Sequence, residues 1–131
     1  MTTMSAIRTE TLYDRLGGAE GISALVEDIV AAHMQNPLIS ARFLPYQDQP
    51  QRLAEVKRHL CDFLGAGSGG TEEYTGRTMP ETHRGMNINE TEYMAAVDDI
   101  LGVLDRHRID AKARKDVLAI AYSLKEQIMH V

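Results

Sequence analysis

With 131 residues and a formal net charge of −5, the chain is long enough for one domain around a single modest core, and its acidity argues against nucleic acids and anionic membrane surfaces as partners. Its single cysteine, Cys61, cannot form an internal disulfide, and no stretch approaches a signal peptide or the roughly 20 apolar residues that span a bilayer. We therefore expect a single cytoplasmic domain over residues 1–131, with no membrane attachment.

Along most of the chain, apolar residues recur at intervals of three and four, which is the spacing of a helix with one buried face. The first such stripe comprises Ile22, Leu25, Val26, Ile29 and Val30, and its helix is predicted to end before Pro37. The second comprises Leu53, Val56, Leu60, Phe63 and Leu64. The glycine-rich stretch 65–70 is expected to end the second helix.

Two further helices are predicted in the C-terminal part. One opens at Asn89, an N-cap residue type that is followed three residues later by Glu92, as in a capping box. The other begins near Asp110. Their inward stripes are Tyr93, Ala96, Val97, Ile100, Leu101 and Leu104, and then Val117, Leu118, Ala121, Leu124 and Ile128. No run alternates with a period of two, so the predicted fold class is all-α.

Two segments are expected to be irregular. Residues 44–50 are bracketed by prolines, and residues 65–78 are rich in glycine, threonine and serine. A loop longer than about 12 residues is uncommon in a small domain and is usually functional or mobile. The second loop leads directly to His83, which draws attention to that histidine.

Neutral imidazole is a common metal ligand, and His83 is the first candidate for that role. It follows Pro80, which suits the first turn of a new short helix. Met79, Met86 and Ile88 supply apolar surface on either side. From the residues alone, however, a histidine on a short polar segment is more often a surface residue, and both interpretations stay open at this point.

The other histidines differ in their positions on the predicted helices. His59 lies on or beside the buried stripe of its helix. It is either a metal ligand or a histidine at the edge of the core, and both interpretations stay open. His33 continues the first stripe and is expected to be partly buried and bonded to a backbone carbonyl. His107 follows a helix end, where a cation suits the dipole. His130 is penultimate and is expected to fray.

Other site chemistries find no support in the sequence. A di-iron carboxylate bundle needs Glu-x-x-His motifs, which the chain lacks. The His59-Leu60-Cys61 segment has no partners at zinc spacing. There is no phosphate loop of the Gly-x-x-x-x-Gly-Lys type and no Gly-x-Ser-x-Gly elbow.

Several motifs together resemble a known family. They are Leu12-Tyr13-Asp14-Arg15-Leu16-Gly17-Gly18, Val26-Glu27-Asp28, Phe43, Phe63, Gly69-Gly70, Tyr74-x-Gly76-x-x-Met79 and His83-x-Gly85. With these motifs the chain resembles the truncated haemoglobins of group I, from about Leu12 to Val131. The resemblance implies a two-over-two helical sandwich, with B and E helices against G and H helices around haem b. Residues 1–10 would be a flexible or pre-A extension.

The resemblance also implies a set of site residues. His83 would be the proximal iron ligand and His59 the distal one, and Phe43 would pack on the haem face. The remaining haem contacts would be Val56, Leu60, Met79, Arg84, Ile88 and Tyr93. Arg84, Lys57 and Arg58 would pair with the haem propionates, the alternative being that they are solvated surface charges.

The distal side departs from the best-known group I pattern of a tyrosine in the B helix and a glutamine in the E helix. Val30 falls at the tyrosine position and Leu60 at the glutamine position. His59 occupies a position where some cyanobacterial relatives carry an iron-binding histidine, which implies a six-coordinate iron. The position of the covalent haem link in certain relatives falls near Glu126, so we expect no such link here.

The resemblance implies a monomeric haem protein that binds O2, NO or CO in competition with His59 and is reduced by a separate, unidentified reductase. Two alternatives stay open. One is a nitric oxide dioxygenase, against which Val30 and Leu60 count. The other is a bis-histidyl electron-transfer protein or redox sensor.

Overall fold

The computed structural model describes residues 10–131, so the expected N-terminal extension lies outside them apart from Glu10. Its elements in chain order are α2 (Leu12–Arg15), α3 (Gly18–Gln35), α4 (Ser40–Phe43), the 3-10 helix η1 (Leu44–Asp48), α5 (Pro50–Gly67), α6 (Met79–His83), α7 (Glu90–Arg106) and α8 (Ala111–Ile128). Over these residues the structure contains no strand, only an isolated parallel bridge between Ile88 and Met129. The predicted all-α fold class is confirmed.

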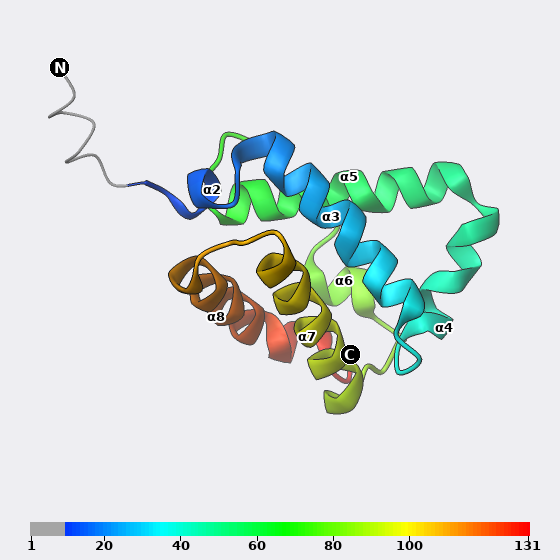
Figure 1. Ribbon diagram of the computed structural model, residues 1–131. Helices are drawn as coiled ribbons and strands as arrows, with labels where there is room; N and C mark the ends of the chain where they lie inside the picture. Colours follow the sequence, from blue (N-terminus) through cyan, green and yellow to red (C-terminus); the bar gives the residue numbers. More distant parts are fainter. Residues whose placement is uncertain (1–9) are drawn as a thin grey trace, which may run out of the picture.

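The long helices form two pairs. α3 packs against both α5 and α7, and α7 packs against α8, while α6 contacts α8 (Figure 1). The main core lies where α3 meets the other helices, and its fully buried side chains are Ile22, Leu25, Val26, Val30, Val103 and Leu104. A second, smaller cluster is built on Ile88, Tyr93 and Val97 beside the end of α8. This arrangement agrees with the predicted two-over-two sandwich.

Local capping explains where several helices begin. The Asn89 side chain accepts a hydrogen bond from the Glu92 amide at 2.8 Å, and the Glu92 carboxylate accepts one from the Asn89 amide at 3.2 Å, which is the predicted capping box. Asp110 caps α8 by accepting from the Ala113 amide at 2.8 Å. α3 ends at Gln35, before Pro37, as predicted. Each of these signals is local, so the sequence pattern located them correctly.

The second helix does end within residues 65–70, as predicted, although it runs past the first glycine of that stretch. α5 continues through Gly65 to Gly67. The Gly70 amide donates to the Gly65 carbonyl at 2.8 Å, which satisfies one of the carbonyls that are left over at the helix end. Gly65 is buried, and a Cβ there would lie 2.8 Å from the Glu72 side chain. Close packing by the following loop therefore overrides the low helix propensity of glycine.

The loop after α5 is fastened to α2. The Tyr13 amide donates to the Ser68 carbonyl at 2.8 Å, and the Tyr13 hydroxyl donates to Glu72 Oε2 at 2.9 Å. The hydrogen bond to Glu72 raises the pKa of Tyr13 above its usual value. The Tyr13 ring lies directly over Gly70, where there is no room for a side chain. Gly70 thus leaves room for Tyr13, while Gly69, with a φ of 98°, occupies the left-handed region that favours glycine in a turn.

Two expectations about irregular or loose segments were wrong. Residues 44–48 form η1, whose proline lies in its first turn, where no amide is required. His130 is not frayed: its amide donates to the Ile88 carbonyl at 3.0 Å, and its Nδ1 lies 3.0 Å from Asn87 Oδ1. The Gly85 amide donates to the carbonyl of Val131 at 3.0 Å. The end of the chain is therefore docked on the turn between α6 and α7.

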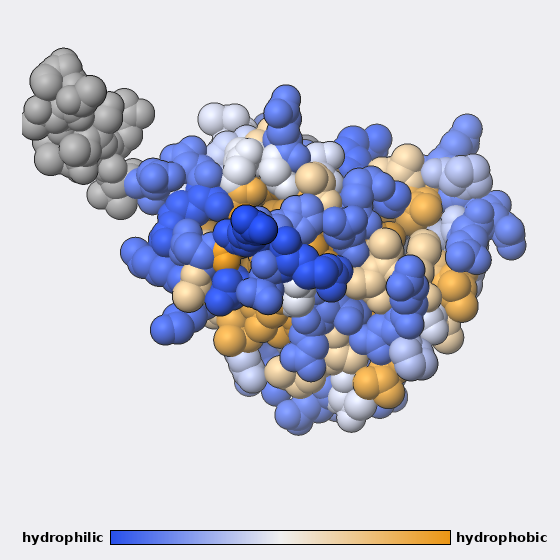
Figure 2. All heavy atoms as spheres, in the orientation of Figure 1, coloured by the Kyte–Doolittle hydropathy of each residue, from blue (hydrophilic) through white to orange (hydrophobic). Residues whose placement is uncertain are grey.

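The surface is dominated by hydrophilic residues on the face shown in Figure 2, with hydrophobic ones scattered between them. Within residues 10–131, the exposed large hydrophobic side chains are Leu38, Leu44 and Tyr122. No helix in this part of the chain combines the length and the apolar character needed to cross a bilayer.

Candidate functional site

His83 lies in the last turn of α6, and its ring is held by a backbone carbonyl. Its Nδ1 is 2.8 Å from the Met79 carbonyl oxygen. Because a carbonyl can only accept, Nδ1 carries a proton, and in the neutral imidazole Nε2 is then left with a free lone pair. The side chain is half-buried. This is the tautomer that a metal ligand requires, and the carbonyl is the kind of partner that orients a metal-binding imidazole.

α6 is short, and its start is fixed by a capping box. The Thr78 hydroxyl accepts from the Glu81 amide at 3.3 Å, while the Glu81 carboxylate accepts from the Thr78 amide at 3.0 Å. Hydrogen bonds from Thr78 hold the pKa of Glu81 below its usual value. The first turn also contains Pro80, which is pre-set for a helix start. His83 therefore sits on a segment whose local structure is well specified.

His59 is half-buried on α5 and lies against an aromatic side chain that the sequence prediction had not included in the site. The Tyr74 ring meets the His59 ring edge-on, with centroids 6.2 Å apart, and meets the Phe63 ring edge-on at 5.3 Å. The Tyr74 hydroxyl donates to the Arg77 carbonyl at 2.6 Å. A Cβ at Gly76 would lie 2.5 Å from Tyr74 Cζ, which explains the Tyr-x-Gly spacing. That spacing was the signal that could have identified Tyr74.

The apolar residues predicted for the site fall into two groups. Phe43, Val56 and Met79 are half-buried and belong to neither core cluster, and Phe63 shares both properties. Leu60 is half-buried against the main cluster, and Ile88 and Tyr93 are buried in the second cluster. The Tyr93 hydroxyl donates to the Ala121 carbonyl and so ties α7 to α8, and burial raises the pKa of this tyrosine.

His33 is buried, but the expected backbone partner was wrong. Its Nδ1 lies 2.9 Å from Asp99 Oδ2, and Asn36 Nδ2 donates to both oxygens of the same carboxylate at 3.1 Å. Burial lowers the pKa of His33, while Asp99 acts in the opposite direction. The His33 ring centroid is 5.0 Å from that of Phe43. Asp99 is 66 residues away along the chain, so no local pattern could have indicated it.

The basic residues proposed for haem propionates are dispersed. Arg58 and Arg84 are exposed, and Lys57 Nζ lies 3.0 Å from Glu27 Oε1 on α3. His107 is likewise engaged elsewhere, with Nε2 2.6 Å from Asp28 Oδ2. Lys57 therefore already has an acidic partner.

Two cavities lie away from His59 and His83. A groove of about 560 Å³ is lined by α3 and α7, with Asp28, Ala31, Ala32, Gln35, Asn36, Asp99 and Arg106 around it. An apolar cavity of about 40 Å³ lies between α2, α5 and α8, behind Phe63. Neither cavity is lined by His59 or His83.

The donor set fits haem better than a bare metal ion. Within residues 10–131, no group of three or more His, Cys, Asp or Glu side chains could hold a metal by itself. A haem iron receives four nitrogens from the porphyrin and needs only one or two protein ligands. His83 offers a free Nε2, and the half-buried apolar side chains outside both clusters offer surface for a flat apolar group.

The family model described as bacterial-like globin matches residues 11–130. The chain belongs to the bacterial-like globin family. Among the relatives of this globin, the group 1 truncated haemoglobin GlbN of a Nostoc species is 26% identical over 120 residues, covering 92% of this chain and 98% of the relative. GlbN of a Synechocystis species is 27% identical over 115 residues, covering 85% of this chain and 89% of the relative. The predicted resemblance to group I truncated haemoglobins is thus confirmed.

Solved structures agree with the fold of this globin. The truncated haemoglobin of Tetrahymena pyriformis in its Fe(III) form gives a TM-score of 0.83 at 18% identity, covering 93% of this chain and 100% of that one. The haemoglobin of Chloroflexus aurantiacus gives a TM-score of 0.76 at 21% identity, covering 94% of this chain and 100% of that one. The two-over-two fold is therefore confirmed, and haem binding follows from membership of the family.

Proposed function

We propose that this globin binds haem b through His83 and, at the iron, reversibly binds diatomic gases such as O2, NO or CO. The observation that carries the proposal is the 2.8 Å hydrogen bond from His83 Nδ1 to the Met79 carbonyl, which leaves Nε2 free to coordinate. Haem, when bound, supplies a redox-active iron with axial positions for exchangeable ligands.

His83 would be a fixed ligand because both ends of its imidazole have a defined role. Donation from Nδ1 to the carbonyl sets the ring orientation and raises the basicity of Nε2. The capping box at Thr78 and Glu81 keeps the helical turn in place beneath the ring. Apolar side chains such as Phe43 and Met79 would exclude water from the same region.

We further propose that His59 competes with external ligands for the sixth position. Val30 is buried in the main core with 2% of its surface exposed, and Leu60 is apolar, so neither position offers a hydrogen-bond donor to a ligand. His59 is the polar side chain that we assign to the distal face. If only about 1% of molecules have His59 displaced, the apparent dissociation constant is about 100-fold weaker than the intrinsic one.

Absorption spectra of haem-reconstituted protein, ferric and ferrous, test both assignments. We expect His83→Ala to lose haem or its normal coordination, and His59→Ala to change from low-spin to high-spin. His107→Ala is the matched control, because its ring is bonded to Asp28 away from the candidate site. Unchanged coordination in His83→Ala would refute the proximal assignment, and a high-spin wild type would refute His59 as a ligand while leaving gas binding in place.

The same variants separate gas binding from the alternatives. If His59 remains bound in both oxidation states and CO displaces it only slowly, bis-histidyl electron transfer or redox sensing becomes the better function. A nitric oxide dioxygenase would form nitrate within one fast turnover when the reduced protein in aerated buffer is mixed with nitric oxide. The apolar Val30 and Leu60 lead us to expect no such fast phase.

We also propose that this globin works as a cytoplasmic monomer and depends on a separate reductase. The 131 residues contain no flavin or nicotinamide motif, which supports a separate source of electrons for the iron. The single thiol, Cys61, is half-buried, and burial raises its pKa. Sedimentation of the reconstituted protein would test the monomeric state.

A further inference from the structure

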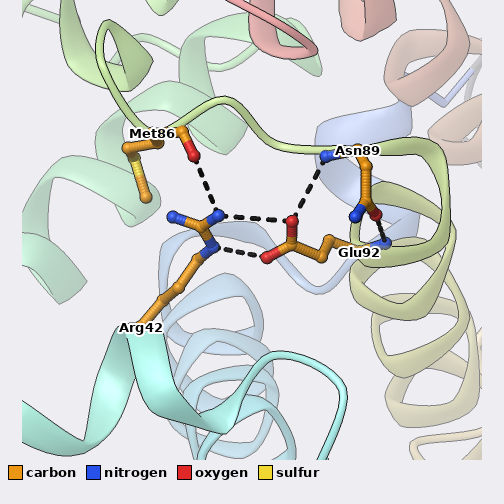
Figure 3. A network of polar contacts seen from close by, with 4 residues as sticks. All are labelled: Arg42, Met86, Asn89 and Glu92. Carbon is orange, nitrogen blue, oxygen red and sulfur yellow. Dashed lines mark hydrogen bonds and ion pairs between the residues drawn. The ribbon is translucent and has the colours of Figure 1, made fainter.

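Arg42 joins α4 to a segment far away in the sequence, which comprises the turn before α7 and the first turn of α7 (Figure 3). Its Nε donates to Glu92 Oε2 at 2.5 Å, and its Nη2 donates to Glu92 Oε1 at 3.2 Å. The same Nη2 donates to the Met86 carbonyl at 2.9 Å. Glu92 Oε1 also accepts from the Asn89 amide at 3.2 Å, so one carboxylate both caps α7 and holds the guanidinium. A fork of this kind is stronger and more directional than a single contact.

The pair is partly shielded from water, which distinguishes it from an ordinary surface ion pair. The side chains of Arg42 and Glu92 are 28% and 18% exposed. The hydrogen bonds from Arg42 hold the pKa of Glu92 below its usual value. Exposed pairs contribute little because water and salt screen them, whereas a bidentate, partly shielded pair loses less to screening.

The position of this network gives it a role beyond local stability. Arg42 immediately precedes Phe43, and Met86 follows His83 by three residues. α4 packs against α3 and η1, whereas the link to the turn between α6 and α7 runs through the Arg42 side chain. The guanidinium therefore connects the segment carrying Phe43 to the segment carrying His83.

We propose that Arg42 and Glu92 form a clamp that closes one edge of the haem site by fixing the Phe43 segment against the His83 segment. Arg42 is then a positioning residue for haem retention, and the inference rests on the haem binding proposed above. With the clamp intact, haem leaves only when both segments move apart. Without it, the His83 turn opens separately from α4.

Two variants break the clamp in different ways. Arg42→Met removes the guanidinium and keeps an apolar stem of similar length. Glu92→Gln removes the charge but keeps a side chain that serves equally well in a capping box. We expect each to speed haem transfer to excess apomyoglobin about tenfold, which corresponds to about 1.4 kcal/mol. The double variant should be no faster than Arg42→Met alone, because removal of the guanidinium already breaks its bonds to both Glu92 and the Met86 carbonyl.

The matched control is Arg15→Met. Arg15 pairs with Asp110 and so links α2 to α8, outside the segments that carry Phe43 and His83. Arg15→Met removes an arginine–carboxylate pair between two helices, as Arg42→Met does. We expect its haem-transfer rate to stay within about twofold of wild type, since this pair involves neither the Phe43 segment nor the His83 segment.

Hydrogen–deuterium exchange distinguishes a clamp from general destabilisation. In both clamp variants we expect faster exchange confined to residues 40–44 and 84–92, with α3 and α8 unchanged. Uniformly faster exchange would overturn the proposal. So would a faster loss of haem in Arg42→Met with none in Glu92→Gln, because Arg42 would then act alone on a haem propionate. Failure of the wild type to take up haem would instead refute the proposed function itself, whereas normal uptake with unchanged loss rates would refute only the clamp.

Discussion

Gly70 offers a sharp test of how tightly the loop after α5 is packed. A Cβ at this position would lie 2.6 Å from Glu72 Oε1 and closer still to two carbons of the Tyr13 ring. The ring cannot easily turn away, because the Tyr13 hydroxyl donates to Glu72 and its amide donates to the Ser68 carbonyl. Gly70→Ala must therefore displace an aromatic ring that is held at both ends.

The expected magnitude follows from overpacking. Adding a methyl group to a filled site destabilises a protein by about 1–3 kcal/mol, and we expect the upper half of that range because displacement of Tyr13 also breaks its hydrogen bond to Glu72. For a chain of this size the melting temperature should fall by roughly 5–10 °C. Gly67→Ala is the matched control: it lies at the end of α5 with nothing within 4 Å of its Cβ. It should stabilise the protein by about 0.5–1 kcal/mol.

Urea unfolding followed by circular dichroism at 222 nm measures both free energies. Equal slopes with urea for all three proteins would show that the substitutions change the stability without changing the surface exposed on unfolding. The reasoning about Tyr13 is refuted if Gly70→Ala stays within about 0.5 kcal/mol of wild type, or if Gly67→Ala is as destabilising as Gly70→Ala.

Three further predictions concern the candidate site. Tyr93→Phe removes the bond to the Ala121 carbonyl and should lower the free energy of unfolding by about 1 kcal/mol; an unchanged urea midpoint would contradict it. Because burial puts the pKa of His33 below its ordinary value of 6.5, the folded state binds fewer protons than the unfolded chain, so stability should fall as the pH drops below 6.5. His33→Phe should flatten that slope between pH 7.5 and 5.5, and an identical slope would rule out His33 as its source. Thr78→Ala should weaken the start of α6 by about 1 kcal/mol, seen as faster amide exchange at residues 79–83; exchange at the wild-type rate would show that the cap is dispensable.

Local signals accounted for most of the helices. The start of α7 at Asn89 and of α8 at Asp110 follows from side chains that cap amides two or three residues away. The end of α3 follows from Pro37, which disfavours helix in the residue before it. These features depend only on residues that are close in the sequence, so they can be predicted without knowledge of the rest of the fold.

Contacts between distant segments could not be read in the same way. Asp99 as the partner of His33 and Glu92 as the partner of Arg42 depend on how α3 and α4 meet α7. The continuation of α5 through Gly65 depends on packing by a later loop. The role of His83 came from the family resemblance, because its residue pattern alone favoured a surface histidine. The assignments of His59 and His83 as iron ligands remain predictions until the spectra are measured.

The docking of the chain end has a consequence for the order of folding during synthesis. His130 contacts Asn87, which lies 43 positions earlier in the sequence, and the Val131 carbonyl accepts from the Gly85 amide. A nascent chain emerges from its N-terminus, so α3, α5 and α6 leave the ribosome before these last residues exist outside it. The turn that follows His83 can make these contacts only once residues 130 and 131 have emerged. We therefore expect the segment that carries the proximal histidine to be the last part of the domain to mature.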